Sequence, residues 1–113
     1  MIEPNEIDLT SLSCVAFDQH SSLPKVPAIY FCLMADATPV YIGETENLHR
    51  RWNCTHDKKM WCRDVGVSTL AWLPFVVEGK SGFESRYERK AIEKLFVNHW
   101  RPKLNTVFPA HRK

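Results

Sequence analysis

The sequence predicts an α+β fold in which helices flank a small three-stranded antiparallel sheet. Two short apolar strands joined by a turn predict a β-hairpin, a third apolar strand follows a helical stretch, and a long amphipathic helix comes last. With 113 residues, of which 44% are hydrophobic and 25% charged, the chain can form one hydrophobic core but not two. This composition excludes disordered and collagen-like proteins.

The N-terminal segment differs in charge from the rest of the chain. Up to residue 24 it contains four acids and no lysine or arginine. Two prolines between residues 24 and 27 interrupt any helix there. We therefore expect residues 1–26 to form an acidic arm, helical or extended, that packs on a globular domain of residues 27–113.

Residues 28–43 are predicted to form the hairpin. Residues 28–35 are apolar and aromatic, as in a buried strand, and residues 36–39 have the composition of a turn. Residues 40–43 form a second strand that ends at Gly43, where the backbone bends or allows a close approach.

Two helices are predicted after the hairpin. Thr45 or Asn47 can cap the first, in which Leu48 and Trp52 are four residues apart and therefore lie on one side. A second helix is expected over residues 57–64.

The third strand and the long helix follow. The strand covers residues 67–77, and its Pro74 lacks a backbone donor, so we place that part at an edge or a bulge. Ser81 and Glu84 fit a capping box that opens a helix reaching Trp100. Its predicted apolar side consists of Tyr87, Ala91, Ile92, Leu95, Phe96, Val97 and Trp100.

Positive charge is concentrated in the middle of the chain. Residues 49–63 contain five lysines and arginines and a single acid. Such a run indicates either a solvated helix face or a surface that tracks a phosphate backbone without reading sequence. The candidate nucleic-acid-binding residues are Arg50, Arg51, Lys58, Lys59 and Arg63.

Five landmarks occur in order along residues 27–105. They are Ala28-Ile29-Tyr30, Tyr41-Ile42-Gly43, the helix from Asn47 to Arg51, Glu93, and Pro102 with Asn105. Taken together, these landmarks resemble those of the GIY-YIG nucleases, which have them in the same order. The first tripeptide departs from the family pattern, because Ala28 stands in place of its glycine.

The resemblance implies a divalent-metal-dependent endonuclease that hydrolyses phosphodiester bonds in DNA. Glu93 would hold Mg²⁺ (or Mn²⁺), since one carboxylate can anchor a cation that keeps most of its waters. Tyr41 would act as the general base, and Arg51 would hold the scissile phosphate. The catalytic residues it implies are Tyr30, Tyr41, Arg51, His56, Glu93 and Asn105, with Tyr30 orienting water or phosphate, His56 assisting proton transfer and Asn105 bracing the site.

Several alternatives remain open. A non-catalytic nucleic-acid-binding module could retain the same fold, although such relatives tend to lose the arginine, the glutamate or the second tyrosine. Cys54, His56 and Cys62 suggest zinc, but only three local ligands are present. The four tryptophans could stack bases or belong to the core.

The sequence also suggests how the protein is used. No part of the chain forms a second domain for target recognition, which predicts low sequence specificity or targeting by a protein partner. The first residues are acidic where a secretory signal is basic, and no apolar run approaches the ~18 residues of a membrane span. Four cysteines without other signs of an oxidising compartment favour reduced thiols, so we expect a cytoplasmic protein.

Overall fold

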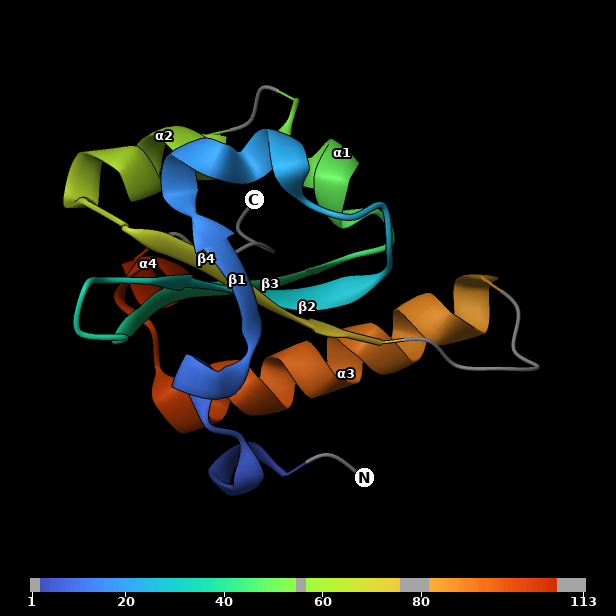
Figure 1. The fold of residues 1–113 in the computed structure, drawn as a ribbon. Helices are drawn as coiled ribbons and strands as arrows, with labels where there is room; N and C mark the ends of the chain where they lie inside the picture. The colour runs from blue at the N-terminus through green and yellow to red at the C-terminus, as the bar shows by residue number, and fades with distance from the viewer. Residues whose placement is uncertain (1–2, 55–56, 76–81, 108–113) are drawn as a thin grey trace.

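A four-stranded antiparallel sheet organises the protein (Figure 1). The computed structural model describes residues 3–54, 57–75 and 82–107. The strand order is β1-β4-β2-β3, so β3 forms one edge of the sheet. The α+β class predicted from the sequence is confirmed, but the sheet has one strand more than the three expected.

The predicted hairpin forms the centre of this sheet and one of its edges. Strand β2 (Ala28–Leu33) pairs with β3 (Pro39–Thr45), and Tyr30 lies opposite Gly43. On its other side β2 pairs with β4 (Thr69–Pro74). Because β2 is paired on both sides and covered on both faces, all six of its residues are buried.

The additional strand β1 (Ser13–Ala16) comes from the acidic N-terminal segment. It pairs with Thr69 to Trp72 of β4 and stops there, so Pro74 lies beyond the end of β1, at a locally free edge as predicted. Three of the four β1 residues are exposed. Such a strand lacks an apolar alternation, which explains why the sequence pattern did not predict it.

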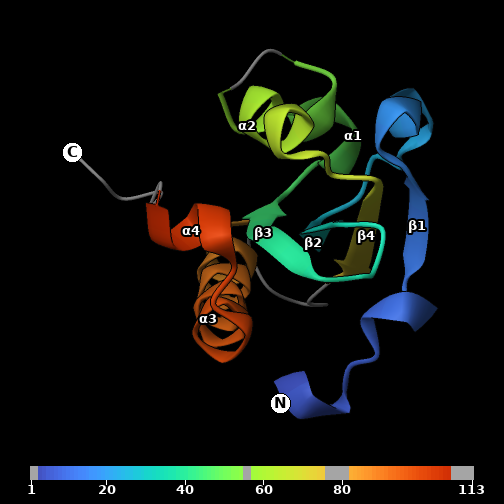
Figure 2. The same cartoon turned by 90° about the vertical axis from the view of Figure 1, so that its left-hand side faces the viewer.

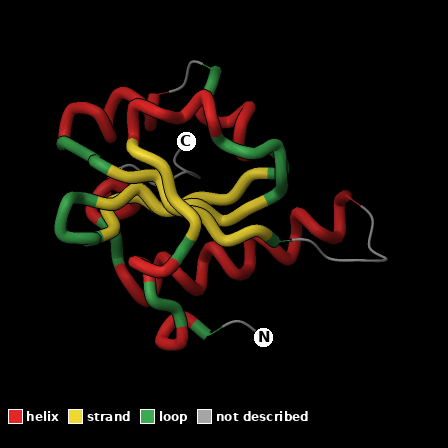
Figure 3. The backbone as a smooth tube through the Cα atoms, viewed as in Figure 1, coloured by secondary structure: helices red, strands yellow, loops and turns green. Residues whose placement is uncertain are grey.

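Helices cover the two faces of the sheet separately (Figures 1 and 2). One face carries α1 (Leu48–Trp52), α2 (Asp57–Val65) and the 3₁₀ segment Phe17–Ser22, and the other face carries α3 (Gly82–Trp100). The last helix, α4 (Lys103–Val107), lies beside β3. Two further 3₁₀ turns precede β1, at Pro4–Glu6 and Leu9–Ser11. The backbone trace shows the sheet between these layers (Figure 3).

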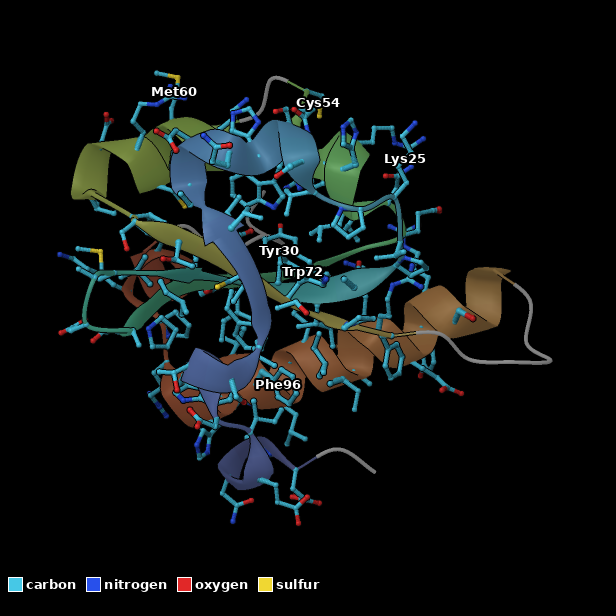
Figure 4. All side chains as sticks on the ribbon, in the orientation of Figure 1. Lys25, Tyr30, Cys54, Met60, Trp72 and Phe96 are labelled. Carbon is cyan, nitrogen blue, oxygen red and sulfur yellow. The ribbon has the colours of Figure 1, made fainter. Side chains whose placement is uncertain are left out.

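The side chains of β2 alternate between two apolar clusters. Tyr30 and Cys32 point into the cluster under α1 and α2, whereas Ile29 and Phe31 point into the cluster under α3. Figure 4 shows Tyr30 on the α1 side and Phe96 on the α3 side of the sheet. The four tryptophans belong to these clusters: Trp52 is fully buried, and Trp61, Trp72 and Trp100 are partly buried.

The helix predictions hold with one correction. The Asn47 side chain caps α1 by accepting a hydrogen bond from the Arg50 backbone at 3.0 Å. On α3, however, Tyr87 is 73% exposed and Ala91 is exposed, so their assignment to the apolar side is wrong. At about 100° per residue, Tyr87 lies roughly 140° around the helix from the buried Ile92. The predicted capping box falls outside the described residues.

No helix in the described ranges combines the length and hydropathy that a membrane span requires. All four cysteines are free thiols: Cys14 and Cys54 are exposed, and Cys32 and Cys62 are buried.

Candidate active site at the edge of the sheet

The candidate site begins with a close cross-strand pair, Tyr30 and Gly43. The Tyr30 ring lies across Gly43 so closely that a Cβ at this glycine would overlap the tyrosine hydroxyl and would approach ring atom Cε1 to 2.9 Å. Gly43 is therefore required by the close approach of an aromatic ring, as predicted. The prediction that the strand ends at Gly43 is wrong, because β3 continues to Thr45 through its pairing with β2.

Tyr30 in turn positions Arg51. The Arg51 Nε–H donates to the Tyr30 hydroxyl at 3.4 Å. The Tyr30 ring packs edge-on against Trp52 with ring centres 5.3 Å apart, which limits its movement. Burial raises the pKa of Tyr30 well above its ordinary value, so the hydroxyl stays protonated. Tyr30 thus contacts the arginine, whereas the family resemblance implied that it orients water or phosphate.

Tyr41 lies on the edge strand, facing the same side of the sheet as Tyr30. Tyr41 is buried, and burial raises its pKa to about 12. The positive charge of Arg51 lowers this pKa, whereas the negative charge of Glu93 raises it. The three groups therefore lie within electrostatic reach of one another. Arg51 alone does not offset burial, so Tyr41 is protonated at neutral pH.

Glu93 lies on α3, the helix on the opposite face of the sheet, which packs against the edge strand β3. Its side chain is half-buried. Burial raises its pKa to about 7, an effect opposed by the positive charges of Lys90 and Arg51 and reinforced by Glu44. Within the described residues Glu93 forms no ion pair. A bound cation would favour the ionised form of such a carboxylate.

Asn105 fixes the edge strand at this point. Its Oδ1 accepts a hydrogen bond from the Ile42 backbone N–H at 2.8 Å, and its Nδ2 donates to the Ile42 carbonyl at 2.9 Å. Ile42 is the central residue of the second tripeptide, so Asn105 holds the strand between Tyr41 and Gly43. Both its oxygen and its nitrogen are engaged by the Ile42 backbone, which makes Asn105 a brace for the site.

A buried ion pair joins β3 to α3 next to these residues, and it was not predicted from the sequence. Glu44 accepts from Arg89 Nε at 3.0 Å and pairs with Lys90 Nζ at 3.2 Å. The Glu44 and Arg89 side chains are only 7% and 3% exposed. Alternation along β3 puts Glu44 on the face opposite Gly43, toward α3. An acid at a buried strand position requires a cationic partner, and this signal could have identified the pair.

An open cavity of about 270 Å³ adjoins these groups. It lies between the end of β3, the Arg50–Arg51 part of α1 and the N-terminal half of α3. Its lining is made mainly of charged side chains: Glu44, Glu46, Arg50, Arg51, Arg86 and Arg89, together with Thr45. Arg86 and Arg89 were not among the predicted site residues.

The remaining predicted residues are distributed as follows. Arg50 is exposed at the cavity, Arg63 is exposed on α2, and Lys59 is half-buried there. His56 and the side chain of Lys58 lie outside the described residues. The structure therefore brings together Tyr30, Tyr41, Arg51 and Glu93. Asn105 binds the backbone of Ile42, the residue next to Tyr41.

The donor set at this edge fits a hard divalent cation. Mg²⁺ binds oxygen ligands and keeps several of its waters, so one or two carboxylates suffice. Glu93 supplies a carboxylate without an ion-pair partner among the described residues. Zinc has less support: the described part of the chain contains no group of three His, Cys, Asp or Glu side chains suited to a metal, and Cys62 is buried beside Cys32.

The fold of the chain is similar to that of a GIY-YIG endonuclease domain, so the predicted resemblance is confirmed at the level of the fold. The N-terminal endonuclease domain of UvrC from Thermotoga maritima, bound to its catalytic magnesium, matches with a TM-score of 0.59 and 21% identity. The match covers 78% of this chain and 92% of that domain. A tyrosine-to-phenylalanine mutant of the same domain matches with the same TM-score and identity, over 78% and 91% of the two chains. No family model and no curated protein sequence matches the chain.

Proposed function

We propose that this protein is a divalent-metal-dependent endonuclease that hydrolyses phosphodiester bonds in DNA. The observation that carries the proposal is the meeting of Tyr41, Arg51 and Glu93 at the edge of β3. These residues come from a strand and two helices on opposite faces of the sheet. A purely structural role for each does not account for a half-buried carboxylate that has no ion-pair partner among the described residues and lies near a tyrosine and an arginine.

Arg51 is assigned to the scissile phosphate. Tyr30 engages only its Nε–H, which leaves the two terminal amino groups of the guanidinium for phosphate oxygens. Tyr30 holds this arginine, and Trp52 packs against the Tyr30 ring. The orientation of Arg51 is therefore set before substrate arrives, which favours stabilisation of charge that develops on those oxygens.

Glu93 is assigned to the metal and Tyr41 to proton transfer. When bound, Mg²⁺ (or Mn²⁺) supplies a Lewis acid that stabilises charge on the leaving oxygen. Tyr41, with a pKa of about 12 in the protein alone, needs further positive charge to ionise near neutral pH, because only its phenolate can accept a proton from water. His56 remains a candidate for proton transfer, and Asn105 acts through the strand that carries Tyr41.

The substrate is proposed to be DNA bound through its backbone. Arg50, Lys58, Lys59 and Arg63 would contact phosphates, which gives affinity without sequence specificity. Targeting would then come from DNA structure or from a protein partner. The free thiols fit a reducing compartment such as the cytoplasm.

The alternative is a non-catalytic nucleic-acid-binding module with the same fold. The two functions differ in what Glu93 does: the enzyme needs its carboxylate for the metal, whereas a binding module does not. The presence of the tyrosine, the arginine and the glutamate in one place favours the enzyme.

The decisive experiment compares Glu93→Gln with the wild-type protein on labelled DNA in Mg²⁺, Mn²⁺ or EDTA. The substitution keeps shape and removes the charge, so cleavage should fall by at least about 100-fold, equivalent to a few kcal/mol of transition-state stabilisation. DNA binding and the melting temperature should stay close to wild type. Asp64→Asn, at an exposed acid on α2, is the matched control and should cleave normally. Full activity of Glu93→Gln would remove the proposed metal ligand.

A further inference from the structure

The cavity beside Arg51 contains more positive charge than the proposed reaction uses. We call it the arginine pocket and define it by Glu44, Glu46, Arg50, Arg51, Arg86 and Arg89, which line its volume of about 270 Å³. Arg51 borders both this pocket and the candidate catalytic group. Of the other three arginines, Arg50 is assigned above only to a general contact with the DNA backbone, and Arg86 and Arg89 have no assigned role.

Two of these guanidinium groups are held in the same way. Arg51 is engaged at Nε by the Tyr30 hydroxyl, and Arg89 is engaged at Nε by the Glu44 carboxylate. Among the described residues the Tyr30 hydroxyl is the hydrogen-bond partner of the Arg51 guanidinium, so its two terminal amino groups can donate to a molecule that enters the pocket. The Arg89 side chain is only 3% exposed, so it contributes positive charge to the pocket and not exposed donors. A guanidinium fixed at Nε presents a planar fork that matches phosphate oxygens.

The charges of the pocket do not cancel. Glu44 is already neutralised by Arg89 and also by Lys90, both within 3.2 Å. Glu46 is the other acid, and it is exposed to solvent. Arg50 and Arg86 are exposed and form no ion pair with any residue in the described ranges. The pocket therefore attracts an anion. The buried Glu44–Arg89 ion pair forms the inner wall of the pocket.

The position of the pocket identifies the anion. Arg86 precedes Glu93 by seven residues on α3, which is two helical turns on the same side and about 10 Å along the helix axis. Arg51, on α1, lines the pocket together with Arg86 and lies within electrostatic reach of Glu93. An anion in the pocket is thus close to the phosphate that Arg51 would hold, and the neighbouring charged groups of a DNA strand are its other phosphates.

We propose that the arginine pocket binds a second phosphate of the cleaved strand, beside the scissile one, through the exposed Arg50 and Arg86, with the buried Arg89 adding positive charge. This inference rests on the proposed function, because it uses the scissile phosphate as its reference. According to this proposal, the bound DNA strand continues through the pocket. The pocket then holds an internal backbone phosphate and not the phosphate at a strand end.

The first test measures DNA binding in EDTA, where no cleavage is needed. In the variant Arg50→Gln with Arg86→Gln, the slope of log affinity against log salt should become less negative by about one unit, as expected for the loss of one phosphate contact. Lys94→Gln, which removes an exposed positive charge from the same helix outside the pocket, should leave the slope unchanged. Both arginines are exposed, and a thermal melt verifies that the variant is folded.

The second test locates the phosphate relative to the cut. Substrates carry a single neutral methylphosphonate at successive linkages around the cleavage position, or end there with or without a terminal phosphate. At one linkage beside the cut, the neutral group should reduce kcat/KM of the wild type by about 10-fold, and this penalty should vanish in the double variant. An effect confined to the terminal phosphate would overturn the assignment to an internal phosphate.

The outcomes separate this inference from the proposed function. An equal salt slope for the wild type and the double variant, or an equal loss in Lys94→Gln, would overturn the pocket. A less negative slope in a protein that cleaves no DNA would support the pocket as a phosphate site and refute the nuclease. Cleavage by the wild type without any position-dependent penalty would refute the pocket and leave the nuclease standing.

Discussion

The contact between Tyr30 and Gly43 makes a quantitative prediction for Gly43→Ala. The new methyl group would overlap the Tyr30 ring, which is 1% exposed and packed against Trp52, so neither side can move freely. Overpacking of this kind costs about 1–3 kcal/mol of unfolding free energy. The contact also supports Arg51, so DNA cleavage should fall together with stability.

The magnitude can be isolated with a double-mutant cycle. Tyr30→Leu removes every ring atom that the methyl group would meet, so in that background Gly43→Ala should be neutral or should gain about 0.5–1 kcal/mol from the lower entropy of the unfolded chain. The expected coupling is therefore about 2 kcal/mol. Tyr30→Phe removes only the hydroxyl and should rescue little, because Cε1 would remain 2.9 Å from the new carbon.

Urea denaturation of the single and double variants measures these energies. Gly66→Ala is the matched control: its backbone has φ of +88° and open space around the site, with Met34 Cε as far away as 4.0 Å. Its cost of about 1–2 kcal/mol comes from the left-handed backbone, so it should be the same with Tyr30 or Leu at position 30. If Gly43→Ala also cost the same in both backgrounds, the steric explanation would be refuted.

Three further predictions concern the surroundings of the site. Asn105→Ala should lower the unfolding free energy by about 1–3 kcal/mol, because a backbone donor and acceptor of β3 lose their partner together; in a urea titration Asn105→Asp should be worse, since its carboxylate repels the carbonyl. Glu44→Ala should cost about 3–5 kcal/mol by leaving the buried Arg89 charge unpaired, and most of this stability should return when Arg89→Met is added. Lys58→Ala with Lys59→Ala should weaken DNA binding similarly on unrelated sequences and reduce its salt dependence, measured by fluorescence anisotropy; unchanged affinity would mark that helix face as solvated surface.

The elements with strong local signals were predictable from the sequence. The hairpin follows from an unbroken apolar strand, a turn and a second short strand, and Asn47 identifies the start of α1. The site residues followed from a resemblance in motif order, which places Tyr41 and Glu93 far apart in sequence and together in space. No local pattern brings a helix on one face into reach of a tyrosine on the other.

The features that were missed depend on tertiary contacts. Strand β1 has no apolar periodicity and forms only because β4 offers a free edge. Arg89 and Glu44 are charged residues that sequence patterns assign to the surface, yet each is buried by pairing with the other. Tyr87 was placed on the apolar side by residue type, whereas its angular position on α3 exposes it.

The bond between Asn105 and Ile42 also affects how the molecule behaves toward copies of itself. An edge strand offers unpaired backbone groups with which another chain can form a sheet, a route to swapped dimers and fibres. A foreign strand cannot pair at Ile42 without first displacing the Asn105 amide, which occupies both backbone groups. The opposite edge, β1, is only four residues long. The sheet that carries the candidate site is therefore protected against growth by strand addition at both of its sides.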